Sequence, residues 1–159
     1  MKKLKMVCIL MLIFTISSST VFPGTSVESV RNGIIETAKS YLGTEYHYGG
    51  LGTKGFDCSG FVHHVYLKHG IPIPRMSHNQ YRKGRKITLD NARPADLVFF
   101  TIRGNRISHV GIYLGNNEFI HAPSRGKEVQ VTSLDNSYWK KRFRGAATYI
   151  KVSTRDEKN

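Results

Sequence analysis

The sequence predicts an α+β domain in which N-terminal helices pack on an antiparallel sheet of about five to six strands. In the first half of the chain, apolar residues recur at the spacing of amphipathic helices. From residue 97 onward, short β-branched and aromatic runs alternate with turn residues, as strands do. Because the helices precede the strands, we expect separate layers. The 159 residues suffice for one domain of ordinary size.

Residues 1–24 are predicted to form a signal peptide and a short linker. Three lysines lead into an apolar run over residues 6–16, and small polar residues suited to cleavage follow it. The run is shorter than the roughly 20 residues that a bilayer requires. Ser19 is the predicted last residue of the leader, and the soluble product is expected in the periplasm, the cell wall or the extracellular space. An uncleaved anchor or a buried helix would be the alternatives.

The folded domain is predicted to cover residues 25–152 and to begin with a helix over residues 27–42. Apolar residues at helical spacing define this helix, and Gly43 ends it. A loop with four glycines, residues 44–56, follows.

A second helix is predicted over residues 58–69. Asp57 is suited to cap its start and Gly70 to end it. A short third helix begins at Ser77 and ends near Lys83.

Strands are expected in the second half of the chain, where buried runs are separated by turns. The predicted strands cover residues 97–100, 107–114, 118–122, 128–132 and 146–152. A helical turn is predicted at residues 133–141, and the polar residues 153–159 are expected to fray.

Export would leave Cys58 as the one thiol of the mature protein, since Cys8 lies in the leader. A lone cysteine in an exported protein forms no internal disulfide and is either incidental or reactive. The net charge of +13 would fall to +10 with the loss of three leader lysines. Such a charge favours anionic envelope polymers over nucleic acid, or serves solubility alone. The densest basic cluster consists of Lys140, Lys141, Arg142 and Arg144.

Cys58 is expected at the first turn of the second helix. Unpaired backbone N–H groups and the helix dipole favour negative charge there, so the thiol pKa should be lowered. The same N–H groups could stabilise an oxyanion. The alternative is a buried core cysteine.

His109 and His121 stand out among the seven histidines because each lies inside a predicted strand. A symmetric two-residue turn between the strands would place them on opposite faces. A three-residue loop at residues 115–117, or an equivalent bulge, would pair His121 with Gly111 and bring both imidazoles to one face. His109 could then take the thiol proton while His121 fixes its tautomer. Two satisfied core histidines would be the alternative.

In these features the chain resembles the NlpC family of cell-wall cysteine endopeptidases, of Spr type, which have a reduced papain-like fold. The order Cys, His, His carries the likeness, together with six stretches. These are Tyr46-His47-Tyr48-Gly49-Gly50, Asp57 to Val62, Pro74-Arg75, Ala95 to Phe100, Ser108 to Tyr113 and His121-Ala122. Ala95 departs from the glycine that the family usually has before Asp96.

The resemblance implies cleavage between D-glutamate, through its γ-carboxyl, and diaminopimelate or lysine; some Spr-type members cut the D,D crosslink instead. It implies that Tyr46 lies beside Cys58 and helps to bind substrate or the oxyanion. Asp57, Ser59 and Ser108 would line the pocket for the free amine of the peptide. Arg75 would meet a substrate carboxylate or form a structural ion pair. No metal or cofactor is implied, and a monomer that acts on stem peptides is expected.

Three other functions remain open at this point. An acyltransferase on a related scaffold would place the histidine before the cysteine, which is the reverse of the order here. An amidase would cut between the sugar and the first alanine. A non-catalytic basic module would bind the wall without cleaving it.

Overall fold

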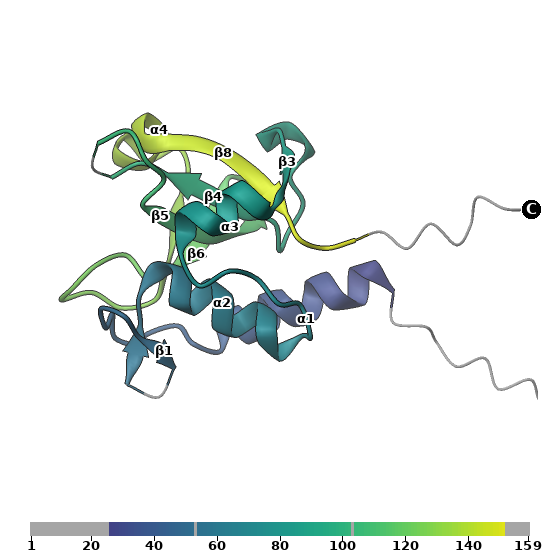
Figure 1. Cartoon of the computed structure of the whole chain (residues 1–159), viewed down its shortest axis with the longest axis horizontal. Helices are drawn as coiled ribbons and strands as arrows, with labels where there is room; N and C mark the ends of the chain where they lie inside the picture. The colour runs from purple at the N-terminus through teal and green to yellow at the C-terminus, as the bar shows by residue number, and fades with distance from the viewer. Residues whose placement is uncertain (1–25, 53, 103, 152–159) are drawn as a thin grey trace, which may run out of the picture.

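The structure is a computed structural model that describes residues 26–52, 54–102 and 104–151 (Figure 1). The predicted leader, residues 1–24, and the predicted tail, residues 153–159, lie outside the described residues. Within the described part, none of the helices is long and apolar enough to cross a membrane.

The predicted helices are present, with shifted ends. Helix α1, Val27–Lys39, starts where the side chain of Ser26 accepts the Ser29 N–H at 3.0 Å. It ends earlier than predicted, in a turn before Gly43, which has a φ of 81°. The other helices are α2, Cys58–Lys68, α3, Ser77–Lys83, and α4, Ser137–Arg142.

Six strands form one antiparallel sheet in the order β3-β8-β4-β5-β6-β7. Their bounds are β3 Arg85–Ile87, β4 Leu97–Phe100, β5 His109–Gly115, β6 Glu118–His121, β7 Gln130–Ser133 and β8 Phe143–Thr148. Two further short strands, β1 Leu51–Gly52 and β2 Gly55–Phe56, pair inside the glycine-rich segment that was predicted to be a loop. The α+β prediction is confirmed.

Apolar side chains cover both faces of the sheet. Helices α1 and α2 pack on one face, where Ile34 and Phe61 join Leu97 and Val110 in the larger core. On the opposite face a smaller core forms around Trp139 of α4. Because β4 is buried on both sides, its four residues show no exposed position. The centre of the sheet therefore exposes neither face to solvent.

Ala95 lies in the turn before β4 with a φ of 72°. This left-handed region favours glycine, which explains why a family glycine is expected here. The turn is held by the Ala95 N–H, which donates to the Tyr113 carbonyl at 2.8 Å, and by the Tyr66 hydroxyl, which donates to the Ala95 carbonyl. These bonds hold alanine in the strained conformation.

Candidate active site

Cys58 is the first residue of α2, as predicted. Asp57 caps the helix, because its side chain accepts the Gly60 N–H at 2.7 Å. Its other carboxylate oxygen accepts the Gly49 N–H at 3.0 Å. The cap thus ties the glycine-rich segment to the start of α2 and fixes where the sulfur lies.

The thiol of Cys58 lies against the beginning of β5. Its Sγ donates a long hydrogen bond of 3.9 Å to the carbonyl of Ser108, the residue before His109. Backbone hydrogen bonds from Val110 and Ser59 to the sulfur favour its anion. The residue as a whole remains partly exposed, so it is not sealed in the core.

The predicted lowering of the thiol pKa is wrong. Burial of the sulfur raises the pKa of Cys58 to about 11, and the Asp57 carboxylate adds to the rise. The backbone N–H groups at the helix start act in the predicted direction, but desolvation outweighs them. The resting residue is therefore a neutral thiol at neutral pH.

The hairpin of β5 and β6 brings the two histidines together through a bulge. Its turn has two residues, Asn116 and Asn117, with φ of 50° and 58°, which matches a type I′ turn. The pairing shifts between Tyr113 and Gly115, so Leu114 is the extra residue. The three-residue loop is absent from this hairpin, and the equivalent bulge that we expected takes its place.

The imidazoles of His109 and His121 consequently share one face and interact. Nε2 of His109 lies 2.8 Å from Nδ1 of His121, and the rings are nearly perpendicular. Gly111 makes room for this pair, since a Cβ there would lie 2.6 Å from the Phe119 ring and 3.2 Å from the His121 Cβ. His109 is 3% exposed and His121 is fully buried.

Burial keeps both imidazoles neutral. It lowers the pKa of His109 to about 3. It also lowers the pKa of His121, with smaller contributions from His109 and Lys127. Aromatic rings enclose the pair, because Trp139 packs against both imidazoles.

Thr132 extends this chain of polar groups and was not predicted from the sequence. Its Oγ1 lies 3.0 Å from Nε2 of His121 and accepts the Gln130 amide at 3.3 Å. The pairing of β6 with β7 places Thr132 there. A threonine in a strand is common, so the residue type alone gave no indication of this contact.

Arg75 forms a structural ion pair, which was one of its two predicted roles. Its guanidinium contacts both carboxylate oxygens of Asp57, at 2.9 and 2.5 Å, and donates to the Ser59 hydroxyl at 3.0 Å. Burial alone would raise the pKa of Asp57, but hydrogen bonds from Arg75 and the Gly60 N–H outweigh it and lower that pKa. Ser59 is 5% exposed and bonded in this network, so it braces Asp57.

Tyr46 and Ser108 flank the sulfur. Burial raises the pKa of Tyr46, and the nearby Cys58 and Asp57 raise it further, so the hydroxyl is neutral and can donate. Ser108 is exposed, and its hydroxyl accepts the Ile102 N–H at 2.9 Å. Both residues therefore lie near Cys58, and their roles toward substrate stay predictions.

Two adjoining hollows lie beside this constellation. One, of about 530 Å³, is lined by Tyr46 and Glu45 with the segment from Gly126 to Glu128. The other, of about 420 Å³, contains Thr132, Ser124 and Trp139. Lys127 and Gln130 line both. The two hollows therefore form one groove that runs from Tyr46 to Thr132, whose hydroxyl contacts His121.

Comparisons with known proteins match this fold. The chain is 45% identical over 116 residues to the probable peptidoglycan endopeptidase LytE of Bacillus subtilis, covering 73% of this chain and 34% of LytE. It is 39% identical over 125 residues to the murein DD-endopeptidase/LD-carboxypeptidase MepS of Escherichia coli, covering 78% of this chain and 65% of MepS. The chain thus spans about a third of the first relative and just under two thirds of the second.

Solved structures agree with these relatives. An NlpC/P60 family protein from Bacillus cereus superposes with a TM-score of 0.73 at 34% identity, covering 76% of this chain and 40% of that one. The NlpC/p60 domain of the peptidoglycan hydrolase SagA gives a TM-score of 0.66 at 36% identity, with 74% and 97% covered. The family described as NlpC/P60 matches residues 43–148, which hold Cys58, His109 and His121. The chain belongs to the NlpC/P60 family.

Proposed function

We propose that this chain is a cysteine endopeptidase that hydrolyses an amide bond in the stem peptide of peptidoglycan. One observation carries the proposal: the thiol at the start of α2 lies against the start of β5, where the His109 imidazole is bonded at 2.8 Å to His121. In this proposal the nucleophile comes from the start of α2, the base from the start of β5 and the orienting group from β6. The names of LytE and MepS support the same activity.

The first step is attack by Cys58 with proton transfer to His109. Nε2 of His109 is engaged by His121, so Nδ1 is the nitrogen that accepts the proton. Since the resting thiol and imidazole are both neutral, the thiolate forms only as the sulfur attacks the carbonyl carbon. His109 then gives the proton to the leaving amine, and a thioester remains on Cys58.

Water completes the reaction. His109, neutral again, takes a proton from water as the oxygen attacks the thioester, and returns it to the sulfur as the carboxylic acid departs and ionises in water. In both steps the oxyanion is stabilised by backbone N–H groups at the start of α2 and by the neutral Tyr46 hydroxyl.

Thr132 selects the tautomer that this mechanism needs. Its Oγ1 accepts the Nε2–H of His121, which leaves His121 Nδ1 free to accept the Nε2–H of His109. The lone pair of His109 then lies on Nδ1. The Gln130 amide donates to the same Oγ1, and the hydroxyl keeps a second lone pair that can accept the His121 N–H.

The bond between γ-D-glutamate and the diamino acid is the proposed target. A relative named γ-D-glutamyl-L-lysine dipeptidyl-peptidase, from Bacillus subtilis, is 32% identical over 128 residues and supports it. The name of MepS supports the D,D crosslink as a second candidate. Residues 1–24 are proposed to direct export, so that a monomeric domain acts in the envelope, where its positive charge also favours anionic polymers.

Mass spectrometry of muropeptides tests this function. Purified sacculi would be incubated with residues 20–159, with Cys58→Ala and with the isosteric Cys58→Ser. Wild type should release fragments ending at γ-D-glutamate, and both variants should lose at least about 10³-fold in rate.

The products also separate the alternatives. Fragments opened at the D,D crosslink would assign the second bond, and release of whole stems from muramic acid would indicate an amidase. Fragments made equally by Cys58→Ala would refute the mechanism. Binding to sacculi with no fragment from wild type would favour the non-catalytic module.

A further inference from the structure

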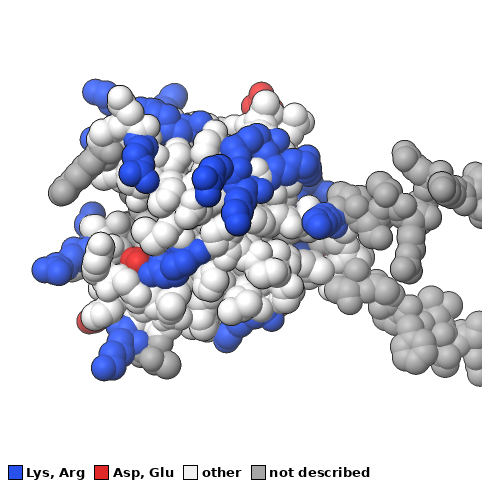
Figure 2. Space-filling view, viewed as in Figure 1, with Lys and Arg blue, Asp and Glu red and all other residues white. Residues whose placement is uncertain are grey.

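A second basic surface lies on α3 and β3. Four cations occur within the five residues 82–86, where Arg82 and Lys83 end α3 and Arg85 and Lys86 begin β3. All four are exposed. Figure 2 shows Lys and Arg gathered over the α3 and β3 region of this face. This run is as dense as the cluster over residues 140–144 and has no part in the proposed reaction.

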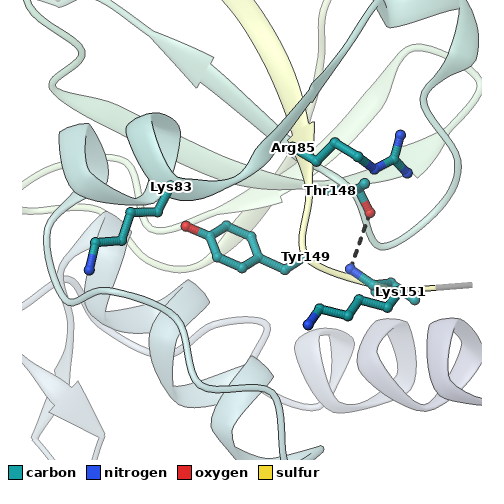
Figure 3. Close-up of a pocket in the computed structure, with 6 residues that line it drawn as sticks. Lys83, Arg85, Thr148, Tyr149 and Lys151 are labelled. Atoms are coloured by element: carbon teal, nitrogen blue, oxygen red, sulfur yellow. Dashed lines mark hydrogen bonds between the residues drawn. The ribbon is translucent and has the colours of Figure 1, made fainter.

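A pocket of about 490 Å³ opens between these residues and the end of β8 (Figure 3). Lys83, Arg85 and Lys151 line it, and they come from three separate segments. Arg85 pairs with Thr148 across β3 and β8. The Tyr149 ring lies between Lys83 and Lys151 in this view, and its hydroxyl donates to the Gln80 carbonyl at 2.7 Å. The pocket is therefore a fixed hollow with cations at its rim.

Its cations lack acidic partners among residues 26–52, 54–102 and 104–151. The three ion pairs found there join Arg31 to Asp96, Arg75 to Asp57 and Arg93 to Glu28. No acidic side chain of that part of the protein lines the pocket. Burial raises the pKa of Tyr149 to about 12, so its phenol adds no negative charge. Within the part of the chain that the structure describes, no acidic side chain compensates the positive charge of this hollow.

The positive surface continues into a neighbouring hollow of about 420 Å³. Arg85 and Thr148 line both hollows. Lys86, whose ammonium donates to the Gly84 carbonyl, and Arg93, which is paired with Glu28, line the second. The carboxylate there, Asp96, is neutralised by its ion pair with Arg31. Two linked cationic hollows suit a chain with regularly spaced anions better than a single ion.

We propose that this surface, named here the α3–β3 basic groove, binds a linear phosphodiester polymer of the cell envelope. Arginine and lysine are the usual ligands of phosphate oxygens, and Arg85 at the junction can contact one phosphate with its planar fork.

A membrane surface fits the groove less well than a soluble polymer. The large exposed apolar side chains of the described residues lie outside it; they are Leu42, Tyr48, Leu51, Leu67, Met76, Val131 and Tyr138. A lipid-binding surface would place such side chains beside its cations. An apolar hollow lined by Val27, Val30 and Ile71 shares Tyr149, Ile150 and Lys151 with the groove. Its three apolar side chains are half-buried, so the water-soluble polymer is the occupant proposed and lipid phosphate is the alternative that the test separates.

The groove is separate from the proposed catalytic site. Strand β3 is an edge strand, and β8 and β4 lie between it and β5, which carries His109. A polymer bound at β3 can therefore hold the domain on the wall while the groove beside Tyr46 and Thr132 stays accessible. This inference does not depend on which bond the enzyme cuts.

Binding to synthetic poly(glycerol phosphate) tests the proposal. Fluorescence anisotropy would compare wild type with Lys83→Gln/Arg85→Gln/Lys151→Gln at about 50 and 200 mM salt. The variant should bind at least about tenfold more weakly at low salt. Its plot of log affinity against log salt concentration should be less steep by about two to three. Its hydrolysis of a soluble muropeptide should equal that of wild type.

The matched control removes the same charge from another place. Lys140→Gln/Lys141→Gln/Arg144→Gln, all at exposed positions, should change affinity less than about twofold. Binding by Cys58→Ala should equal that of wild type, which separates this test from the catalytic one. If the triple variant does not fold, binding by the single variants Lys83→Gln and Lys151→Gln would be measured instead, since both side chains are exposed.

Three outcomes would overturn the proposal. Equal weakening of polymer binding in both triple variants would mean that the effect arises from net charge and not from this groove. No binding of wild type at low salt would remove the site. Tighter binding to phosphatidylglycerol vesicles than to the polymer, lost in the Lys83/Arg85/Lys151 variant, would assign the groove to lipid phosphate instead.

Discussion

Cys58 and His109 have pKa values displaced in opposite directions by the same cause, burial. Desolvation disfavours the thiolate and the imidazolium alike, so the uncharged pair is the resting state. This differs from enzymes in which a preformed thiolate–imidazolium pair waits for substrate. The oxyanion donors near the sulfur must therefore stabilise charge that appears only during attack.

The pH dependence of the rate follows from these values. The base is lost only as pH falls toward the pKa of His109, about 3, and the thiol ionises only near its pKa of about 11. We expect kcat/KM on a soluble muropeptide to vary less than about threefold between roughly pH 5 and pH 8. Stopped assays with a circular dichroism check of folding would measure it. A tenfold fall centred near the ordinary histidine pKa would contradict the buried, neutral His109.

Thr132 is a positioning residue whose effect should appear in kcat. Thr132→Val keeps the shape but cannot accept the His121 N–H, so the His109 tautomer is less well fixed. One neutral hydrogen bond is worth about 1 kcal/mol, which predicts a roughly five- to tenfold fall in kcat. Thr132→Ser should restore most of it. Steady-state kinetics would separate kcat from KM, and a rise in KM alone would mean that Thr132 binds substrate in the groove.

At the scale of elements, the sequence predicted those parts whose side chains carry a pattern. Strand β4 has its predicted bounds because Leu97 to Phe100 are buried on both faces. Strand β3 was missed, since it has three residues and its side chains are mostly exposed. It exists through pairing with β8, about 60 residues later in the chain. Such long-range pairing produces no recognisable pattern in the residues of the strand itself.

The candidate site likewise contains some features that the sequence predicted and others that it did not. The positions of Cys58, His109 and His121 follow from local rules: a capped helix start and a hairpin with an odd residue. Thr132 and the thiol pKa depend on which strands and rings surround the site. Tertiary packing decides those, and the sequence could not predict them.

The turn before β4 permits a matched comparison of two buried alanines. Ala95 and Ala38 are both fully buried, but Ala95 has a φ of 72° whereas Ala38 lies in α1. Glycine removes a methyl worth about 0.8 kcal/mol at either position. In the helix it adds a penalty of about 1 kcal/mol, and at positive φ it relieves about 1–2 kcal/mol of strain.

Ala38→Gly should therefore lower the free energy of unfolding by about 2 kcal/mol, and Ala95→Gly should leave it unchanged or raise it slightly. Urea titrations of both variants against wild type would measure the difference. Equal losses would show that the Ala95 turn is unstrained.

For the whole molecule, the buried histidine pair links the active site to acid stability. His109 and His121 pack with Phe100, Phe119 and Trp139, the centre of the smaller core. Protonating either imidazole would place a charge in that core. Unfolding exposes both to water, where they titrate at the ordinary histidine pKa. The unfolded chain therefore binds more protons than the native protein below that pKa.

The buried histidines make the free energy of unfolding fall in acid. A folded pKa below the unfolded one makes the histidine contribution complete above about pH 6.5, and the contribution is lost as pH falls toward the folded value. For His109 the loss between about pH 6.5 and pH 4.5 is about 2–3 kcal/mol, at roughly 1.4 kcal/mol per pH unit. Native carboxylates held by arginine, such as Asp57, titrate below this range and add little to it.

We expect the free energy of unfolding of wild type to fall by about 2–3 kcal/mol more than that of His109→Gln over this range, because glutamine does not titrate. Urea titrations at four pH values would give both slopes. His78→Gln is the matched control, since it makes the same substitution at a half-buried side chain outside the smaller core. Parallel slopes for wild type and His109→Gln would mean that the native protein accommodates the imidazolium, and the neutral resting pair would have to be abandoned.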